Sequence, residues 1–364
     1  MMARRDRPTT DGATSEGRDA SASALASLSD GRGLPRPREG SFDAADGTAL
    51  RYAHWPAAKQ GRQGSVVYLQ GRSEFIEKTM DAYAILHRSG FDVWALDWRG
   101  QGLSARALAD PEKGHVTDYQ LYLDDLHLFL SRIIDLGAST GRRILLAHSM
   151  GGHIGLRYLH DHPGVFDAAV FSAPMIDIGV NHLLLRLLNT LIVALGFGER
   201  YALSTGRFRP IYRNPEDPAD NGTLEDYRRL IGSFEALTSD AAKCMEIERL
   251  VRDDPRLALG GPTAVWLQAT FRSISLTWSP GYAEAIETPV LMVGGGRDRV
   301  VVTARQEAMA RRLPNGHFHV IDQAAHELLV ECDDVRALFF EQAAAFVGVD
   351  IDQPEVDMTT CARR

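Results

Sequence analysis

Strand-like and helix-like segments alternate along most of this 364-residue chain, and this alternation restricts its fold more than any other feature. Short apolar runs typical of strands lie at 47–55, 64–71, 91–96, 142–149, 166–174, 290–293 and 319–321. Segments with apolar residues at helical spacing lie at 75–88, 118–137, 151–162, 304–313 and 333–347. Such an order favours a mostly parallel sheet with helices on both faces, so we predict the α/β class.

Both ends and one internal segment depart from this pattern. Residues 1–40 lack aromatic side chains, Val and Ile, and they are rich in Ser, Ala, Gly, Asp and Arg. They offer too little apolar surface to offset the entropy of ordering, so we expect a disordered arm there and a flexible tail over 349–364. Residues 176–285 do not alternate, and proline interrupts them repeatedly. We therefore expect a core of 41–175 and 286–348, with 176–285 as a helical insertion.

Charge and hydropathy exclude several classes of protein. The net charge is -8, so no chain-wide basic field exists to attract nucleic acid. Residues 1–7 are charged, but no apolar segment of a secretory signal follows them. The longest apolar stretch, 183–198, contains Arg186 and Asn189 and is too short and too polar for a membrane span. Three widely spaced cysteines fit a reducing compartment. We expect a cytoplasmic protein whose oligomeric state the sequence leaves open.

A single serine stands at the corner between a strand and a helix, in the stretch "LLAHSMGGHIGL". A strand that turns directly into a helix needs small residues on both sides of the turn, and here Ala147 and Gly151 flank Ser149. The turn lifts the Ser149 hydroxyl above the sheet, beside the free N–H groups at the helix N-terminus. The alternative is a serine that only caps the helix.

A serine hydroxyl needs a base, and the base needs a third group that orients it. In this architecture the acid and the histidine follow the serine in chain order, each in a loop after a later strand. Asp298 follows the strand at 290–293 and His326 follows the strand at 319–321. We predict Ser149 as the nucleophile, His326 as the general acid and base, and Asp298 as the orienting carboxylate. Asp322 is the rival acid, although an isolated Asp in a loop more often forms a turn.

An oxyanion hole requires two backbone N–H donors near the nucleophile. The residue after the serine, Met150, is expected to supply one of them. The loop "LQGRSEF" follows the first buried strand, and Gly71 would permit a close approach there, so we assign the second N–H to Arg72.

Other polar residues near these motifs have structural explanations. His148 is expected to pack against neighbouring loops, and the stretch 97–104 is expected to hold loops beneath the site. His317 and His319 share one side of a strand, but no third metal ligand can be placed beside them. We predict no metal and no organic cofactor.

Several stretches in order resemble the lysophospholipase L2 and monoacylglycerol lipase group of α/β hydrolases. They are "GRSEFIEKTMDAYAILHRSGFDVWALDWRGQGLS", "LADPEKGHVTDYQLYLDDL", "LLAHSMGGHIGLRYL" and "HPGVFDAAVFSAPM". The resemblance covers about residues 41–347. It implies a cap over the site, a substrate that is a glycerol ester with one acyl chain, and the functional residues already assigned. Gln70-Gly71 stands where lipases of the group have His-Gly, which is closer to the lysophospholipase branch.

We therefore predict a serine hydrolase that cleaves an ester of a monoacylated glycerol lipid and contacts a membrane surface transiently. The leucine-rich helix after Asn181 would either pack within the insertion or line a tunnel for the acyl chain. A general carboxylesterase or thioesterase is the alternative enzyme. A non-catalytic scaffold is the alternative from another class, although a scaffold has no need of a complete triad.

Overall fold

The computed structural model describes residues 24–58, 62–134, 141–178, 182–208 and 236–352. An eight-stranded sheet forms its centre, in the order β1-β2-β4-β3-β5-β6-β7-β8. The strands are β1 (Arg38–Asp43), β2 (Ala49–Trp55), β3 (Gly64–Leu69), β4 (Phe91–Leu96), β5 (Arg142–His148), β6 (Ala168–Ser172), β7 (Val290–Gly295) and β8 (Gly316–Ile321). The first two pairings, β1 with β2 and β2 with β4, are antiparallel, and the others are parallel. This is the α/β-hydrolase fold, as predicted.

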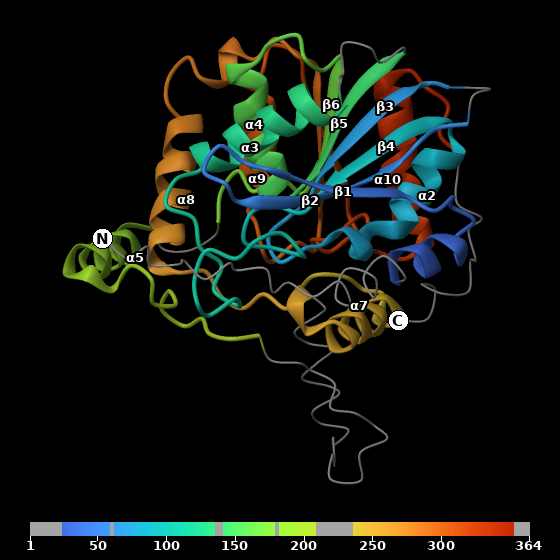
Figure 1. Cartoon of the computed structure of the whole chain (residues 1–364). Coiled ribbons are helices and arrows are strands. Elements are labelled where there is room, and N and C mark those ends of the chain that lie inside the picture. Colours follow the sequence, from blue (N-terminus) through green and yellow to red (C-terminus); the bar gives the residue numbers. More distant parts are fainter. Residues whose placement is uncertain (1–23, 59–61, 135–140, 179–181, 209–235, 353–364) are drawn as a thin grey trace, which may run out of the picture.

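Helices cover both faces of the sheet (Figure 1). The core helices are α2 (Met80–Arg88), α3 (Gln120–Leu128), α4 (Met150–Asp161), α9 (Thr303–Ala310) and α10 (Asp333–Val347). Helices α2 and α10 lie on one face, and α3 and α4 lie together on the other. Strands β3 to β7 are buried along almost their whole length, which explains why they are continuous apolar runs in the sequence.

Residues 24–40, which the sequence assigns to a disordered arm, are folded, while residues 1–23 of that arm lie outside the described residues. Residues 24–30 are helical, and Leu25 is completely buried in the main core. The indole N–H of Trp55 on β2 donates to the buried hydroxyl of Ser29 at 3.3 Å. Strand β1 also starts before residue 41. The expected disordered arm through residue 40 is therefore wrong for residues 24–40, because a few leucines suffice to anchor a short helix against the sheet.

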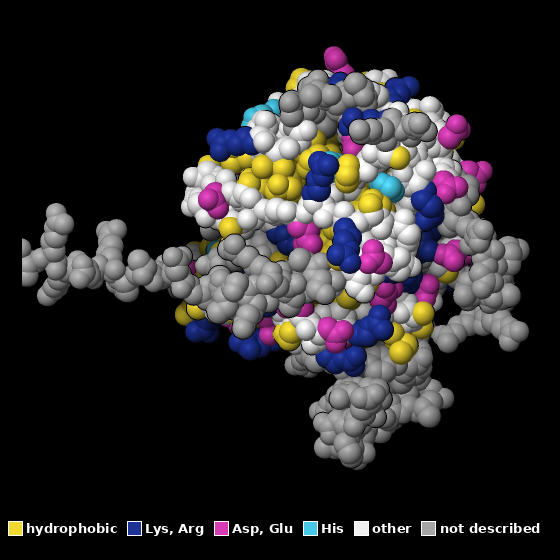
Figure 2. All heavy atoms as spheres, turned by 45° about the vertical axis from the view of Figure 1, so that its right-hand side comes forward, with side chains coloured by type: hydrophobic (Ala, Val, Ile, Leu, Met, Phe, Trp, Pro, Cys, Tyr) yellow, Lys and Arg dark blue, Asp and Glu magenta, His cyan; other side chains and the backbone are white. Residues whose placement is uncertain are grey.

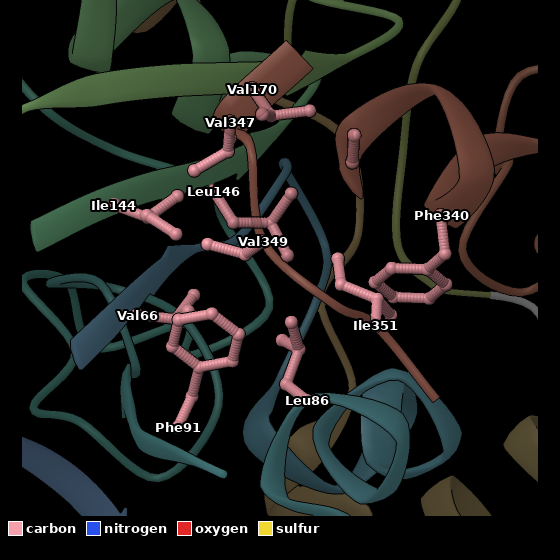
Figure 3. Close-up of a pocket in the computed structure, with 11 residues that line it drawn as sticks. Val66, Leu86, Phe91, Ile144, Leu146, Val170, Phe340, Val347, Val349 and Ile351 are labelled. Atoms are coloured by element: carbon pink, nitrogen blue, oxygen red, sulfur yellow. The ribbon is translucent and has the colours of Figure 1, made fainter. Parts of the chain in front are cut away.

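The first residues of the expected C-terminal tail also pack on the core. Val349 and Ile351 cover a small gap above β3, β4 and β5, between α2 and α10 (Figure 3). The gap measures about 20 Å³ and its lining is wholly apolar, so a water molecule there would lack hydrogen-bond partners. The prediction of a flexible tail from residue 349 is therefore wrong for residues 349–352, because these side chains close an apolar face of the sheet.

Residues 176–285 lie between β6 and β7, and their described part consists of helices joined by loops. Their helices are α5 (His182–Ile192), α7 (Ala241–Asp253) and α8 (Ala264–Thr277). Helix α5 packs on α8 and projects from the body of the molecule (Figure 1). Within the described residues, no helix is long and apolar enough to cross a bilayer. Charges of both signs are interspersed on the face drawn in Figure 2, in keeping with the modest net charge.

Candidate active site

Ser149 lies at the corner between β5 and α4, in a backbone conformation that non-glycine residues rarely adopt. Its φ is 49° and its ψ is -114°. The turn is tight enough that a Cβ on Gly151 would lie 2.3 Å from the carbonyl oxygen of Leu69, and one on Gly152 would lie 2.7 Å from Pro174. The two glycines after the serine are therefore required by close packing, and the strained residue is the one that carries the hydroxyl.

The three residues expected to form a triad lie within hydrogen-bond distance of one another. His326 Nε2 is 2.9 Å from Ser149 Oγ, and His326 Nδ1 is 2.7 Å from Asp298 Oδ2. A carboxylate can only accept, so Nδ1 carries the proton and Nε2 is free to accept from the serine hydroxyl. The other oxygen of Asp298 accepts the N–H groups of Val300 at 2.7 Å and Val301 at 3.0 Å. The side chains of Asp298 and His326 are buried, at 0% and 4% exposure.

The rival assignments do not enter this arrangement. Asp322 is exposed, and among the described residues its side chain has no hydrogen bond to His326. His148 packs as expected: its Nδ1 lies 3.1 Å from the carbonyl oxygen of Ser172, and its ring lies 4.9 Å from that of His326. Burial lowers the pKa of His148.

The loop after β3 is held by side chains that the sequence analysis did not assign individually. The amide of Gln101 donates to the carbonyl oxygen of Gly71 at 2.9 Å and accepts the N–H of Ser73 at 3.2 Å. The N–H of Gly71 donates to Glu74. Glycine suits this position, because an added Cβ would lie 2.9 Å from Cδ2 of His148 and 3.2 Å from the Cβ of Ser149. Gln101 belongs to the stretch 97–104, which was expected to hold loops beneath the site.

The backbone N–H groups of Arg72 and Met150, the two predicted oxyanion-hole donors, are oriented by the hydrogen bonds of the carbonyl groups that precede them. In a trans peptide the C=O and N–H point in opposite directions. Gln101 fixes the carbonyl of Gly71, so the N–H of Arg72 points away from Gln101. The carbonyl oxygen of Ser149 accepts from His153 at 3.2 Å and Met175 at 2.9 Å, which directs the N–H of Met150 the opposite way. Among the described residues, neither of these two N–H groups has an acceptor.

A buried cluster of charges lies beside residues 70–74 after β3, called the oxyanion loop below because this loop contains Arg72, one of the predicted donors. Lys78 Nζ is 3.1 Å from Glu74 and 2.6 Å from Glu327, and all three side chains are at most 8% exposed. The carboxylates of Glu74 and Glu327 also lie close to His148, in an arrangement that could hold a metal ion. The ammonium group of Lys78 already occupies the position of a cation between the two carboxylates, so the cluster does not fit a metal centre.

We therefore expect ester hydrolysis to be unchanged after dialysis against EDTA. The cation of the cluster is part of the chain, and the triad needs no Lewis acid. The measurement compares initial rates on a soluble ester before and after dialysis. A loss of activity that a divalent ion restores would contradict the expectation.

The fold, the strained serine and the hydrogen-bonded histidine and aspartate define the class of α/β serine hydrolases. The chain belongs to the family described as serine aminopeptidase, S33, whose model matches residues 60–333. Lysophospholipase L2 of Escherichia coli K12 is 32% identical over 311 residues, which cover 82% of this chain and 84% of that protein. The monoacylglycerol lipase of Mycolicibacterium smegmatis is 26% identical, over 78% of this chain and 86% of that one.

Solved structures with low sequence identity share the fold. A monoglyceride lipase from Saccharomyces cerevisiae aligns with a TM-score of 0.63 at 19% identity, over 86% of this chain and 95% of that one. A carboxyl esterase from Bacillus coagulans aligns with a TM-score of 0.64 at 17% identity, over 86% and 98%. The resemblance drawn from the sequence motifs is thereby confirmed at the level of family and fold.

Proposed function

We propose that this protein is a serine hydrolase that cleaves the ester bond of a monoacylated glycerol lipid, either a lysophospholipid or a monoacylglycerol. The hydrogen-bonded chain from Ser149 through His326 to Asp298 carries the proposal. The relatives named lysophospholipase and monoacylglycerol lipase support the choice of substrate.

The proposed mechanism uses only groups of this chain. His326 removes the proton of the Ser149 hydroxyl as its oxygen attacks the ester carbonyl carbon. The N–H groups of Arg72 and Met150 stabilise the negative charge that develops on the carbonyl oxygen. His326 then protonates the departing glycerol oxygen, which leaves an acyl group on Ser149. Water, deprotonated by His326, attacks this acyl-enzyme and releases the fatty acid.

A substrate series tests the reaction and its alternatives. Lysophospholipids and monoacylglycerols of matched acyl chain are compared with short p-nitrophenyl esters, acyl thioesters and amino-acid p-nitroanilides. We expect the highest kcat/KM on the monoacyl lipids. A preference for thioesters or for anilides would overturn the proposed substrate class, and absence of fluorophosphonate labelling at Ser149 would indicate a scaffold.

We further propose that residues 176–285 form a cap and that α5 rests on the lipid surface. Most of the leucines of this helix lie on one face, and that face is exposed to solvent. The leucine face therefore neither packs within the insertion nor lines a tunnel, which were the two alternatives from the sequence. In α5, Leu183, Leu184, Leu187 and Leu191 are 71%, 72%, 61% and 54% exposed, and Leu195 in the segment that follows is 62% exposed. The opposite side of α5 packs on α8 through polar groups: Asn189, 2% exposed, donates to the carbonyl oxygen of Ala264 at 2.9 Å. An apolar face turned outward fits a membrane surface.

Substitution of Leu187 and Leu191 by Asp is expected to weaken binding to phosphatidylcholine–phosphatidylglycerol vesicles by tenfold or more. An exposed leucine transferred into lipid gains up to about 2 kcal/mol, and the introduced charges oppose insertion. Thr190→Asp is the matched control for Leu187→Asp alone, because each variant adds one negative charge at an exposed position of the same helix and only the second removes a leucine. Vesicle co-sedimentation measures binding, and hydrolysis of a soluble ester checks folding. Equal vesicle binding by the wild type and the leucine variant would show that α5 does not contact the membrane.

The cytoplasmic location of the protein stays a prediction, which cell fractionation would test.

A further inference from the structure

The side chain of Arg72 reaches from the oxyanion loop to the underside of the insertion. Its Nη2 donates to the carbonyl oxygen of Gly260, and its Nη1 donates to Ser73 Oγ at 3.1 Å. The guanidinium carbon lies 5.4 Å from the centre of the Trp266 ring on α8. This cation therefore lies within one side-chain length of the proposed oxyanion hole, at the contact between core and insertion.

Arg72, which is half-buried, lacks the carboxylate partners that the buried Arg51 has. Arg51 pairs with Glu39, Glu77 and Asp97. In contrast, no carboxylate of the described residues lies within ion-pair distance of Arg72, and its buried Nε–H has no acceptor. Arg106 also lacks a carboxylate, but it donates to five backbone carbonyls.

The groups around Arg72 compensate only in part for the cost of desolvating its positive charge. Burial lowers its pKa to about 10, and the nearby hydroxyl groups of Tyr122 and Tyr119 raise it only in part. A partly desolvated charge without a counter-charge costs free energy, which an anionic ligand would recover. A guanidinium is well suited to phosphate, since its planar donors can form two charge-assisted hydrogen bonds at once.

The proposed substrates differ in just this group. A lysophospholipid carries a phosphate on the glycerol, whereas a monoacylglycerol carries a neutral hydroxyl. Only the glycerol backbone separates this phosphate from the scissile carbonyl, a separation comparable to the reach of an arginine side chain from its own backbone N–H. With the carbonyl oxygen at the N–H of Arg72, the phosphate can lie near the guanidinium of the same residue.

We propose that the guanidinium of Arg72 binds the phosphate of a lysophospholipid headgroup and so makes this residue a determinant of substrate specificity. The inference rests on the proposed function, because it assigns one part of the same substrate. The backbone N–H of Arg72 and its side chain then recognise two different groups of one molecule.

The experiment measures a ratio rather than a single rate. The ratio is kcat/KM for oleoyl lysophosphatidylglycerol over kcat/KM for monooleoylglycerol, both in the same detergent micelles. Any disturbance of the hole by a change at residue 72 affects both substrates and cancels in the ratio. We expect Arg72→Gln to lower the ratio by about tenfold to a hundredfold, as for loss of a hydrogen bond to a charged group, mainly through KM.

Two further variants and two soluble anions complete the test. Arg72→Lys keeps the positive charge but lacks the paired donors of a guanidinium, so its ratio is expected to lie between those of wild type and Arg72→Gln. Arg106→Gln is expected to leave the ratio unchanged. Glycerol 3-phosphate is expected to inhibit wild-type hydrolysis of monooleoylglycerol more strongly than Arg72→Gln. Stronger inhibition by inorganic phosphate than by glycerol 3-phosphate would overturn headgroup recognition in favour of a free-phosphate site. An unchanged ratio in Arg72→Gln would overturn the proposal and leave the side chain a brace for the insertion. Inactivity of the wild type on both lipids would instead refute the proposed function.

Discussion

Substitution of Ser149 by alanine is expected to lower kcat/KM for ester hydrolysis by about four orders of magnitude or more. The hydroxyl oxygen that forms the acyl-enzyme is removed, and His326 then has no nucleophile to deprotonate. Folding should be unaffected, because alanine and serine place the same Cβ in the backbone conformation with φ of 49°. The two glycines that permit the turn are also unchanged.

The measurement combines initial rates on a short p-nitrophenyl ester with labelling by a fluorophosphonate. Ser279→Ala is a suitable control, since this half-buried serine lies just after α8 and its hydroxyl donates to the carbonyl oxygen of Leu276. His326→Ala should cost about as much as Ser149→Ala, and the double variant should be no worse than either, because the triad acts as a unit. Activity of Ser149→Ala near that of the wild type would refute the assignment of the nucleophile.

The core of the fold could be predicted because its signals are local. Buried parallel strands are continuous apolar runs, and the helices between them show one apolar stripe each. Helix α10 begins and ends at the predicted residues, 333 and 347. Ser149, Asp298 and His326 were predictable for the same reason, since each follows a recognisable strand, and the structure brings the three side chains together.

What could not be predicted depends on contacts between distant parts of the chain. The helix at 24–30 has a disorder-like composition, and only its contact with β2 shows why Leu25 is buried. The leucines of α5 have helical spacing, but spacing cannot say whether their face meets protein, substrate or solvent. Glu74 and Lys78 lie four residues apart, so their ion pair could be predicted from the sequence. Glu327 also pairs with Lys78 but is 249 residues away in the sequence.

Replacement of Lys78 by methionine is expected to destabilise the protein by roughly 3–5 kcal/mol at pH 7. Methionine fills a similar volume, so the effect reports the lost charge rather than a cavity. The variant leaves the carboxylates of Glu74 and Glu327 buried without the cation that lies between them. Glu74 also accepts the N–H of Gly71, so its displacement should loosen the oxyanion loop and lower kcat as well.

The pH dependence separates this explanation from a simple packing defect. Burial by itself raises the pKa of Glu74, but Lys78, His148 and the N–H of Gly71 together lower it to about 2. In the wild type this stabilisation is present above the ordinary glutamate pKa of about 4.3 and is lost as the pH falls toward 2. In Lys78→Met, burial without the cation raises the pKa of Glu74, so protonation in mild acid relieves the penalty. The difference in unfolding free energy between wild type and Lys78→Met should therefore be largest at pH 7 and shrink toward pH 4.

Denaturant titrations at both pH values measure this difference. The triple variant Lys78→Met, Glu74→Gln, Glu327→Gln supplies the control, because neutral amides retain the volume and much of the hydrogen bonding without the charge. It should recover part of the stability at pH 7 and lose the pH dependence of the single variant. A loss in Lys78→Met that is equal at pH 7 and pH 4, or no recovery in the triple variant, would mean that the cluster acts through packing. In that event the two buried carboxylates would need another source of compensation.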